Sequence, residues 1–177
     1  MADTAMSVKA DGLDVTLSRL FDAPRALVFR AWTDDHMMSQ WWGPHGLTAT
    51  ARMDARVGGS YELVMHAANG EDYPLTGTFL DIVLNERIVM EMHVGGHPAN
   101  WHDYLAELYT KAGGPPDTKP SLSLITRVTF ADEAGGTRLT VTQTYRSAAD
   151  RDAFIEMGSA GGWGQSFEKL AALLLKA

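Results

Sequence analysis

The final apolar segment of the chain, residues 159–176, constrains the fold most strongly. Four large apolar side chains occupy positions i, i+4, i+7 and i+11 of this segment: Trp163, Phe167, Leu170 and Leu174. This spacing places them on one face of an α-helix. Because a helix with one apolar face must bury it against another element, the rest of the chain has to supply a broad apolar surface.

That surface is expected to be a β-sheet, because most earlier segments alternate apolar and polar residues with a period of two. In the clearest case, residues 87–94, the side chains of Ile88, Met90, Met92 and Val94 share one face. The other expected strands are residues 13–21, 48–53, 60–66, 75–83, 122–130 and 139–145.

Two short helices are expected after the first strand. The first begins near Pro24, with Asp22 as its candidate N-cap, and Asp34 is among the residues that can cap the second. A third helix is expected near residues 97–112, within a longer segment that runs from 95 to 120. That segment is predicted to act as a lid over the pocket mouth, and the alternatives are an insertion packed outside the sheet or a dimer contact.

Two local patterns lead to narrower expectations. In residues 75–83 the large apolar side chains Phe79 and Leu80 are adjacent, so either face of this strand could be the inward one. Gly135-Gly136 is expected to form the turn of the last hairpin.

Four glycines gather where the terminal helix begins, at positions 158, 161, 162 and 164. Glycine disfavours helix, so these residues need another explanation. Either they allow the helix to approach the sheet closely, or they leave space for a ligand.

This order of elements predicts an α+β fold of the helix-grip type. In such a fold a curved antiparallel sheet wraps around a long C-terminal helix and encloses an apolar pocket. We expect a single domain over residues 1–177, with its core at about 13–175 and the helical insertion at 95–120.

Composition excludes several classes of function. The chain has no cysteine, so disulfides, thiolate metal ligands and cysteine nucleophiles are ruled out. Its net charge is −7 with no run of Lys or Arg, which argues against nucleic acid as a partner. No apolar run is long enough for membrane insertion. Met1 to Ala10 carries the acidic Asp3 and lacks the apolar stretch of a secretory signal, so the expected location is cytoplasmic.

Several motifs in series resemble a known family. They are Phe21–Arg25 (FDAPR), 28–33 (VFRAWT), 40–44 (QWWGP), 54–59 (DARVGG) and the glycines around 157–163. The pattern is similar to the homologues of the activator of the Hsp90 ATPase, within the START-like (SRPBCC, Bet v1-like) superfamily.

The resemblance implies a fold more than a reaction. Members of the superfamily include lipid carriers, aromatic polyketide cyclases, hormone receptors and co-chaperones, and they share a cavity between sheet and helix. No catalytic residues are carried over from it. The chain departs from the family at Val57, where proline is usual, and in the long segment 95–120.

The histidines do not form a metal-binding pattern. His93, His97 and His102 do not share a helix turn as the pair in an HExxH motif does. They are interpreted as solvent-exposed loop residues, and neither a metal nor a cofactor is expected.

The pocket lining is predicted from inward-facing strand positions and from the terminal helix. The candidate ligand-binding residues are Trp42, Tyr61, Met65, Met90, Met92, Trp101, Tyr104, Leu124, Val141, Gln143, Tyr145, Trp163 and Phe167. Gln143 stands out because a buried polar group needs a partner, which is either another side chain or a bound ligand.

Three functions are consistent with this pattern. The first is binding of a small hydrophobic or aromatic molecule. The second is a metal-free cyclase-like or hydrolase-like enzyme that uses Tyr61, Tyr104, Tyr145 or His45 as proton donor. The third is an interaction module that forms a homodimer or contacts an Hsp90-type chaperone. An open cavity with convergent polar groups would favour the first two.

Overall fold

The computed structural model describes residues 4–177 of the chain, so Asp3 lies outside this range. The described residues form a single eight-stranded sheet and five helices. The strands are β1 (Ser7–Asp11), β2 (Asp14–Phe21), β3 (Thr48–Met53), β4 (Ser60–His66), β5 (Asp72–Val83), β6 (Arg87–His93), β7 (Ser123–Glu133) and β8 (Gly136–Thr144). The helices are α1 (Arg25–Thr33), α2 (Asp35–Trp41), α3 (Ala99–Lys111), α4 (Ala148–Glu156) and α5 (Ser159–Leu174).

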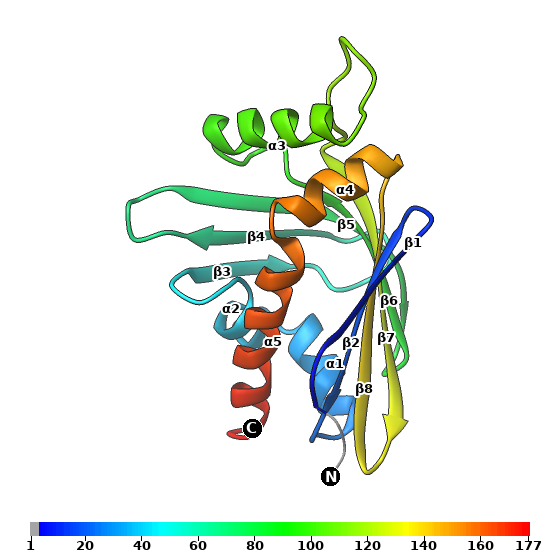
Figure 1. Cartoon of the computed structure of the whole chain (residues 1–177). Coiled ribbons are helices and arrows are strands. Elements are labelled where there is room, and N and C mark those ends of the chain that lie inside the picture. Colours follow the sequence, from blue (N-terminus) through cyan, green and yellow to red (C-terminus); the bar gives the residue numbers. More distant parts are fainter. Residues whose placement is uncertain (1–3) are drawn as a thin grey trace.

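The sheet is antiparallel throughout and has the order β1-β2-β8-β7-β6-β5-β4-β3. It curves around α5, while α1 and α2 lie beside that helix and α3 and α4 cross one end of the sheet (Figure 1). The predicted helix-grip fold is confirmed. None of the helices described for residues 4–177 is long and apolar enough to cross a membrane.

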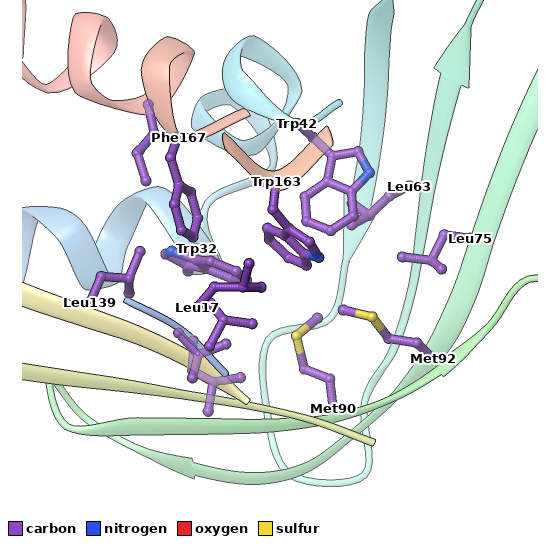
Figure 2. Packing of buried hydrophobic residues seen from close by; sticks show 14 of the residues in the cluster. Leu17, Trp32, Trp42, Leu63, Leu75, Met90, Met92, Leu139, Trp163 and Phe167 are labelled. Carbon is purple, nitrogen blue, oxygen red and sulfur yellow. The ribbon is translucent and has the colours of Figure 1, made fainter. Parts of the chain in front are cut away.

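The predicted register of β6 is confirmed, because Met90 and Met92 are 0 % and 2 % exposed. The face of α5 that carries Phe167 is also buried as predicted. Figure 2 shows Met90 and Met92 rising from the sheet toward Trp163, with Trp32 and Trp42 on either side of that ring. The rings of Trp32 and Trp163 are stacked, with their centroids 6.0 Å apart.

Helix capping follows the prediction for α2 only. The Asp34 side chain accepts a hydrogen bond from the Met37 N–H at 2.9 Å, as an N-cap should. The prediction that Asp22 caps α1 was wrong. The N-cap is Pro24, and it makes no side-chain hydrogen bond to the helix.

A β-bulge in β5 explains why the sequence pattern of residues 75–83 did not show which side chains face inward. The register with β6 shifts between Phe79 and Asp81, so the side chains on either side of the bulge do not keep a single period. Phe79 is fully buried, whereas its neighbour Leu80 is exposed.

The turn of the last hairpin lies one residue earlier than predicted. Ala134 and Gly135 have the positive φ angles, 50° and 82°, which two-residue hairpin turns require. Gly136 instead begins β8, where a Cβ atom would lie 2.2 Å from the carbonyl oxygen of Phe21. Its role is therefore to allow close approach of the two backbones.

Candidate functional site

A cavity of about 280 Å³ lies between the sheet and the first half of α5. Its floor comes from inward-facing residues of β4 to β8, and its sides come from the end of α2, from α3 and from α4. The lining residues are Trp42, Gly43, Pro44, Met65, Leu75, Met92, Val94, His97, Trp101, Leu124, Gln143, Tyr145, Phe154, Met157, Gly158, Ser159, Gly162, Trp163 and Ser166.

The space exists because α5 presents small side chains toward it. Ser159, Gly162 and Ser166 line the cavity at positions i, i+3 and i+7 of the helix, which share one face. A Cβ atom added to Gly162 would meet no heavy atom within 4 Å. Of the two explanations for the glycines, space for a ligand therefore fits Gly162. Gly158 has a φ of 95°, a conformation that suits glycine and lets the chain turn from α4 into α5.

Gln143 is the centre of the polar wall of the cavity. Its Oε1 accepts hydrogen bonds from the Tyr145 hydroxyl at 3.3 Å and from the Trp163 Nε1–H at 3.2 Å. Its Nε2 donates to Thr126 Oγ1 at 3.4 Å, and that hydroxyl donates to the Met92 sulfur at 3.1 Å. The partners of Gln143 are thus other side chains, and they fix the orientation of its amide.

His97 belongs to the cavity, and the prediction that it is a solvent-exposed loop residue was wrong. Its Nδ1 lies 3.0 Å from the carbonyl oxygen of Pro74, and its ring contacts those of Tyr73 and Trp101. Burial, with a smaller contribution from His102, lowers the pKa of His97 to about 4. The ring is therefore neutral at physiological pH.

The structure places eight of the predicted ligand-binding residues in the cavity wall. They are Trp42, Met65, Met92, Trp101, Leu124, Gln143, Tyr145 and Trp163. Met90, Val141 and Phe167 are fully buried in the packed core instead. Tyr104 is 48 % exposed on the outer side of α3, and the Tyr61 hydroxyl donates to the carbonyl oxygen of Glu91 at 2.8 Å.

Sequence reasoning found Trp101 of α3 but missed the other residues that line the rim. Phe154 and Met157 lie at the end of α4, and His97 lies just before α3. The spacing of Ser159, Gly162 and Ser166 was the available signal. A stripe of small residues on the apolar side of a buried helix indicates where that helix leaves space.

Acidification is expected to destabilise the protein through His97. Since folding lowers the pKa of His97 from 6.5 to about 4, the unfolded chain binds its proton more readily in this range, and stability falls as the pH falls. After allowance for partial exposure, the contribution lost between pH 7 and pH 5 is about 1 kcal/mol. The measurement is urea denaturation at both pH values for the wild type and for His97→Asn, which keeps a donor for Pro74. The variant should lose less stability than the wild type, whereas an equal loss in both would contradict the assignment.

His93→Gln provides the control for this experiment. His93 lies on the other face of β6, where it pairs with Glu91 at 3.6 Å, and it does not line the cavity. This variant should not reproduce the change in pH dependence that is expected for His97→Asn.

Comparisons with known proteins agree with this architecture. The model of a family described as activator of Hsp90 ATPase homolog 1-like protein matches residues 22–175. A search of curated proteins found no match. Among solved structures, a protein from Mycobacterium smegmatis is 23% identical over 97% of this chain and 99% of its own, with a TM-score of 0.77. A protein from Chromobacterium violaceum is 28% identical over 92% of this chain and 96% of its own, with a TM-score of 0.68. The AHSA1 protein from Silicibacter pomeroyi is 21% identical over 93% of this chain and 99% of its own, with a TM-score of 0.67.

Proposed function

We propose, from the premise that the chain belongs to the family of activator of Hsp90 ATPase homolog 1-like proteins, that it binds one small apolar or aromatic molecule in the cavity between the sheet and α5. The observation that carries this proposal is the empty space beside Gly162, which is enclosed by aromatic side chains and by one polar wall. Binding pockets for small molecules typically combine apolar walls with a few fixed polar groups. A cavity of about 150 Å³ holds benzene, so about 280 Å³ suits a molecule of one or two rings.

A larger hollow of about 550 Å³ lies over β3 to β6, but it fits this function less well. Its residues include Arg52, Glu62 and Thr76, all of which are exposed. It lacks the apolar walls that remove a ligand from water, so we assign the binding site to the smaller cavity.

The titratable groups of the cavity favour binding over acid–base catalysis. Burial raises the pKa of Tyr145, and its hydroxyl is already bonded to Gln143. The pKa of His97 is lowered to about 4. Both values lie far from neutral pH, where efficient general acids and bases titrate. Contact with an Hsp90-type chaperone, a homodimer through residues 95–120, and a cytoplasmic location stay predictions from the sequence.

The decisive experiment introduces a large side chain on α5 that fills the cavity. Gly162→Leu directs a side chain into the open space and should abolish binding, while the gain in helix propensity of up to about 1 kcal/mol protects the fold. Gly161→Leu is the matched control, because the neighbouring glycine is exposed and does not line the cavity.

Binding is measured by native mass spectrometry of freshly purified protein and by calorimetric titration with naphthalene. The wild type and Gly161→Leu should carry a co-purified molecule or bind naphthalene at one site, and Gly162→Leu should do neither. Equal binding by all three proteins would mean that the ligand binds outside this cavity. No binding by the wild type would refute the proposed function.

A further inference from the structure

The two edges of the sheet differ in how they are covered. The strands at these edges are β1 and β3 (Figure 1). Helix α2 packs against β3, and the Asp35 carboxylate accepts a hydrogen bond from the Met53 N–H at 3.0 Å. The strand β1 has no comparable cover, because all five of its residues are exposed. An uncovered edge strand can pair with a strand of another chain.

The hydrogen-bonding pattern shows which backbone groups of β1 lie on the free edge. The Tyr145 N–H donates to the Leu13 carbonyl oxygen at 3.0 Å, so Leu13 faces β8. Because the direction of the backbone groups alternates along a strand, the odd-numbered residues of β2 face β8 and the even-numbered residues face β1. The latter pair with odd-numbered residues of β1. Val8 and Ala10 therefore direct their N–H and C=O groups away from β2, where no strand of residues 4–177 lies.

The hairpin of β1 and β2 is held in place at its turn. Gly12 has a φ of 57°, which suits the first central position of a type II′ hairpin turn. The Arg151 guanidinium of α4 donates to the Gly12 carbonyl oxygen. The free edge is therefore ordered before a partner binds, and pairing costs little conformational entropy.

Apolar side chains are also uncovered at this edge. Val8 lies opposite Leu17 in the sheet, so it points to the same inner face as that buried residue. Val8 is nevertheless 48 % exposed, and Leu13 in the turn is 43 % exposed. The helices thus leave this corner of the inner face open. A strand added beside β1 would cover part of its apolar surface.

The charges on β1 decide which strand fits beside it. A lysine on an edge strand, such as Lys9, opposes pairing unless it meets an acidic residue. Asp11 lies two positions from Lys9 and on the same face of the strand. Within the hairpin Asp11 is opposite Asp14, so it faces a like charge until it meets a cation. A second copy of β1 supplies both complementary charges.

One antiparallel register between two copies pairs these charges. With Lys9 opposite Lys9 of the second copy, like charges meet. With Val8 opposite Val8 of the second copy, neither Lys9 nor Asp11 has a charged partner. With Ala10 opposite Ala10 of the second copy, each Lys9 lies opposite an Asp11, and the two alanines exchange both of their backbone hydrogen bonds. The charged pairs then occupy non-hydrogen-bonded positions, where side chains are closest.

We infer that β1 is the interface of a symmetric homodimer, in which two copies of the strand pair antiparallel about Ala10 and each Lys9 contacts Asp11 of the second copy. The two sheets then form one continuous sheet. Neither Lys9 nor Asp11 lines the cavity, so this inference does not depend on the proposed function. Because the interface of one short strand is small, the dimer should be weak, with a Kd on the order of 0.1 mM.

Sedimentation velocity of the full chain from about 10 µM to about 1 mM measures this dimer. Lys9→Asp places two carboxylates opposite each other at both ends of the interface and should weaken association by about tenfold or more. The double variant Lys9→Asp/Asp11→Lys restores opposite charges and should dimerise as the wild type does. Lys176→Asp is the control, because it gives the same net charge as Lys9→Asp through an exposed residue near the C-terminus.

Amide hydrogen exchange followed by NMR reports on the backbone bond at the dimer axis. The Ala10 N–H should exchange more slowly as the concentration of the wild type rises, because it is bonded only in the dimer. The Lys9 N–H is the internal control. It bonds to β2 in monomer and dimer alike, so its exchange should depend much less on concentration.

Each outcome decides the inference. A wild type that stays monomeric, with Ala10 exchange independent of concentration, would overturn it. A dimer that Lys9→Asp does not weaken would also overturn it and would place the interface elsewhere, for example at residues 95–120. Equal weakening by Lys9→Asp and by the double variant would contradict the register. Because the exchange measurement uses the wild type, a variant that does not fold leaves the test intact.

Discussion

Replacing Phe167 by alanine is expected to lower the free energy of unfolding by about 3–5 kcal/mol. Phe167 is fully buried, and its ring makes an edge contact with Phe21 and a tilted contact with Trp163, at centroid distances of 5.7 and 5.6 Å. Truncation would leave a void in the half of α5 that is solidly packed against the sheet. Urea denaturation followed by far-ultraviolet circular dichroism measures the loss.

Leu175→Ala is the control for this prediction. Leu175 immediately follows the same helix but is 77 % exposed, so its truncation should change stability by less than about 0.5 kcal/mol. A cost below about 1 kcal/mol for Phe167→Ala would mean that α5 is not held at this point. The packing of α5 against the sheet would then have to depend on other contacts.

The contrast between Phe167 and Gly162 divides α5 into two parts with different roles. Toward its C-terminus, Phe167, Leu170 and Leu174 fill the space over the sheet. Toward its N-terminus, Gly162 leaves that space open. A stability measurement therefore reports mainly on the first part, and a binding measurement mainly on the second.

The sequence predicted the elements whose burial is periodic. In β6 every second residue is buried, and Ile88, Met90 and Met92 alternate with the partly exposed Val89, Glu91 and His93. The strand β1 was missed because all five of its residues are exposed. It pairs only with β2, at the edge of the sheet. A strand without a buried face carries no hydrophobic pattern to detect.

The sequence shows which residues of a strand face inward, but it does not show which of them border the cavity. Alternation shows that Val141 and Gln143 face the same side of β8, but it does not show how far along the strand the helix fills the space. The structure places Val141 in the packed core and Gln143 at the cavity. That difference depends on α5 residues that are distant in sequence, so no pattern within β8 contains it.

Tyr61 illustrates the same limit at the level of one side chain. Its position in β4 faces inward as predicted, but its hydroxyl reaches across β5 to the carbonyl oxygen of Glu91. The contact depends on Gly77, which is paired with Tyr61 in the sheet. A Cβ atom at Gly77 would lie 1.8 Å from the Glu91 carbonyl oxygen and 2.5 Å from the Tyr61 hydroxyl oxygen.

Gly77→Ala is therefore expected to destabilise the protein by about 3 kcal/mol, at the upper end of the cost of overpacking, because a backbone atom of β6 has to move. Tyr61→Phe removes only the hydroxyl and should cost about 1 kcal/mol, the usual net contribution of one hydrogen bond. Gly95→Ala is the matched control, since its new Cβ would make an ordinary contact of 3.9 Å with Leu122. Urea denaturation of the three variants should rank Gly77→Ala as the least stable. If Gly77→Ala instead matched Gly95→Ala, β5 and β6 could separate freely at this point, and the close packing of Tyr61 over Gly77 would not be what holds them together.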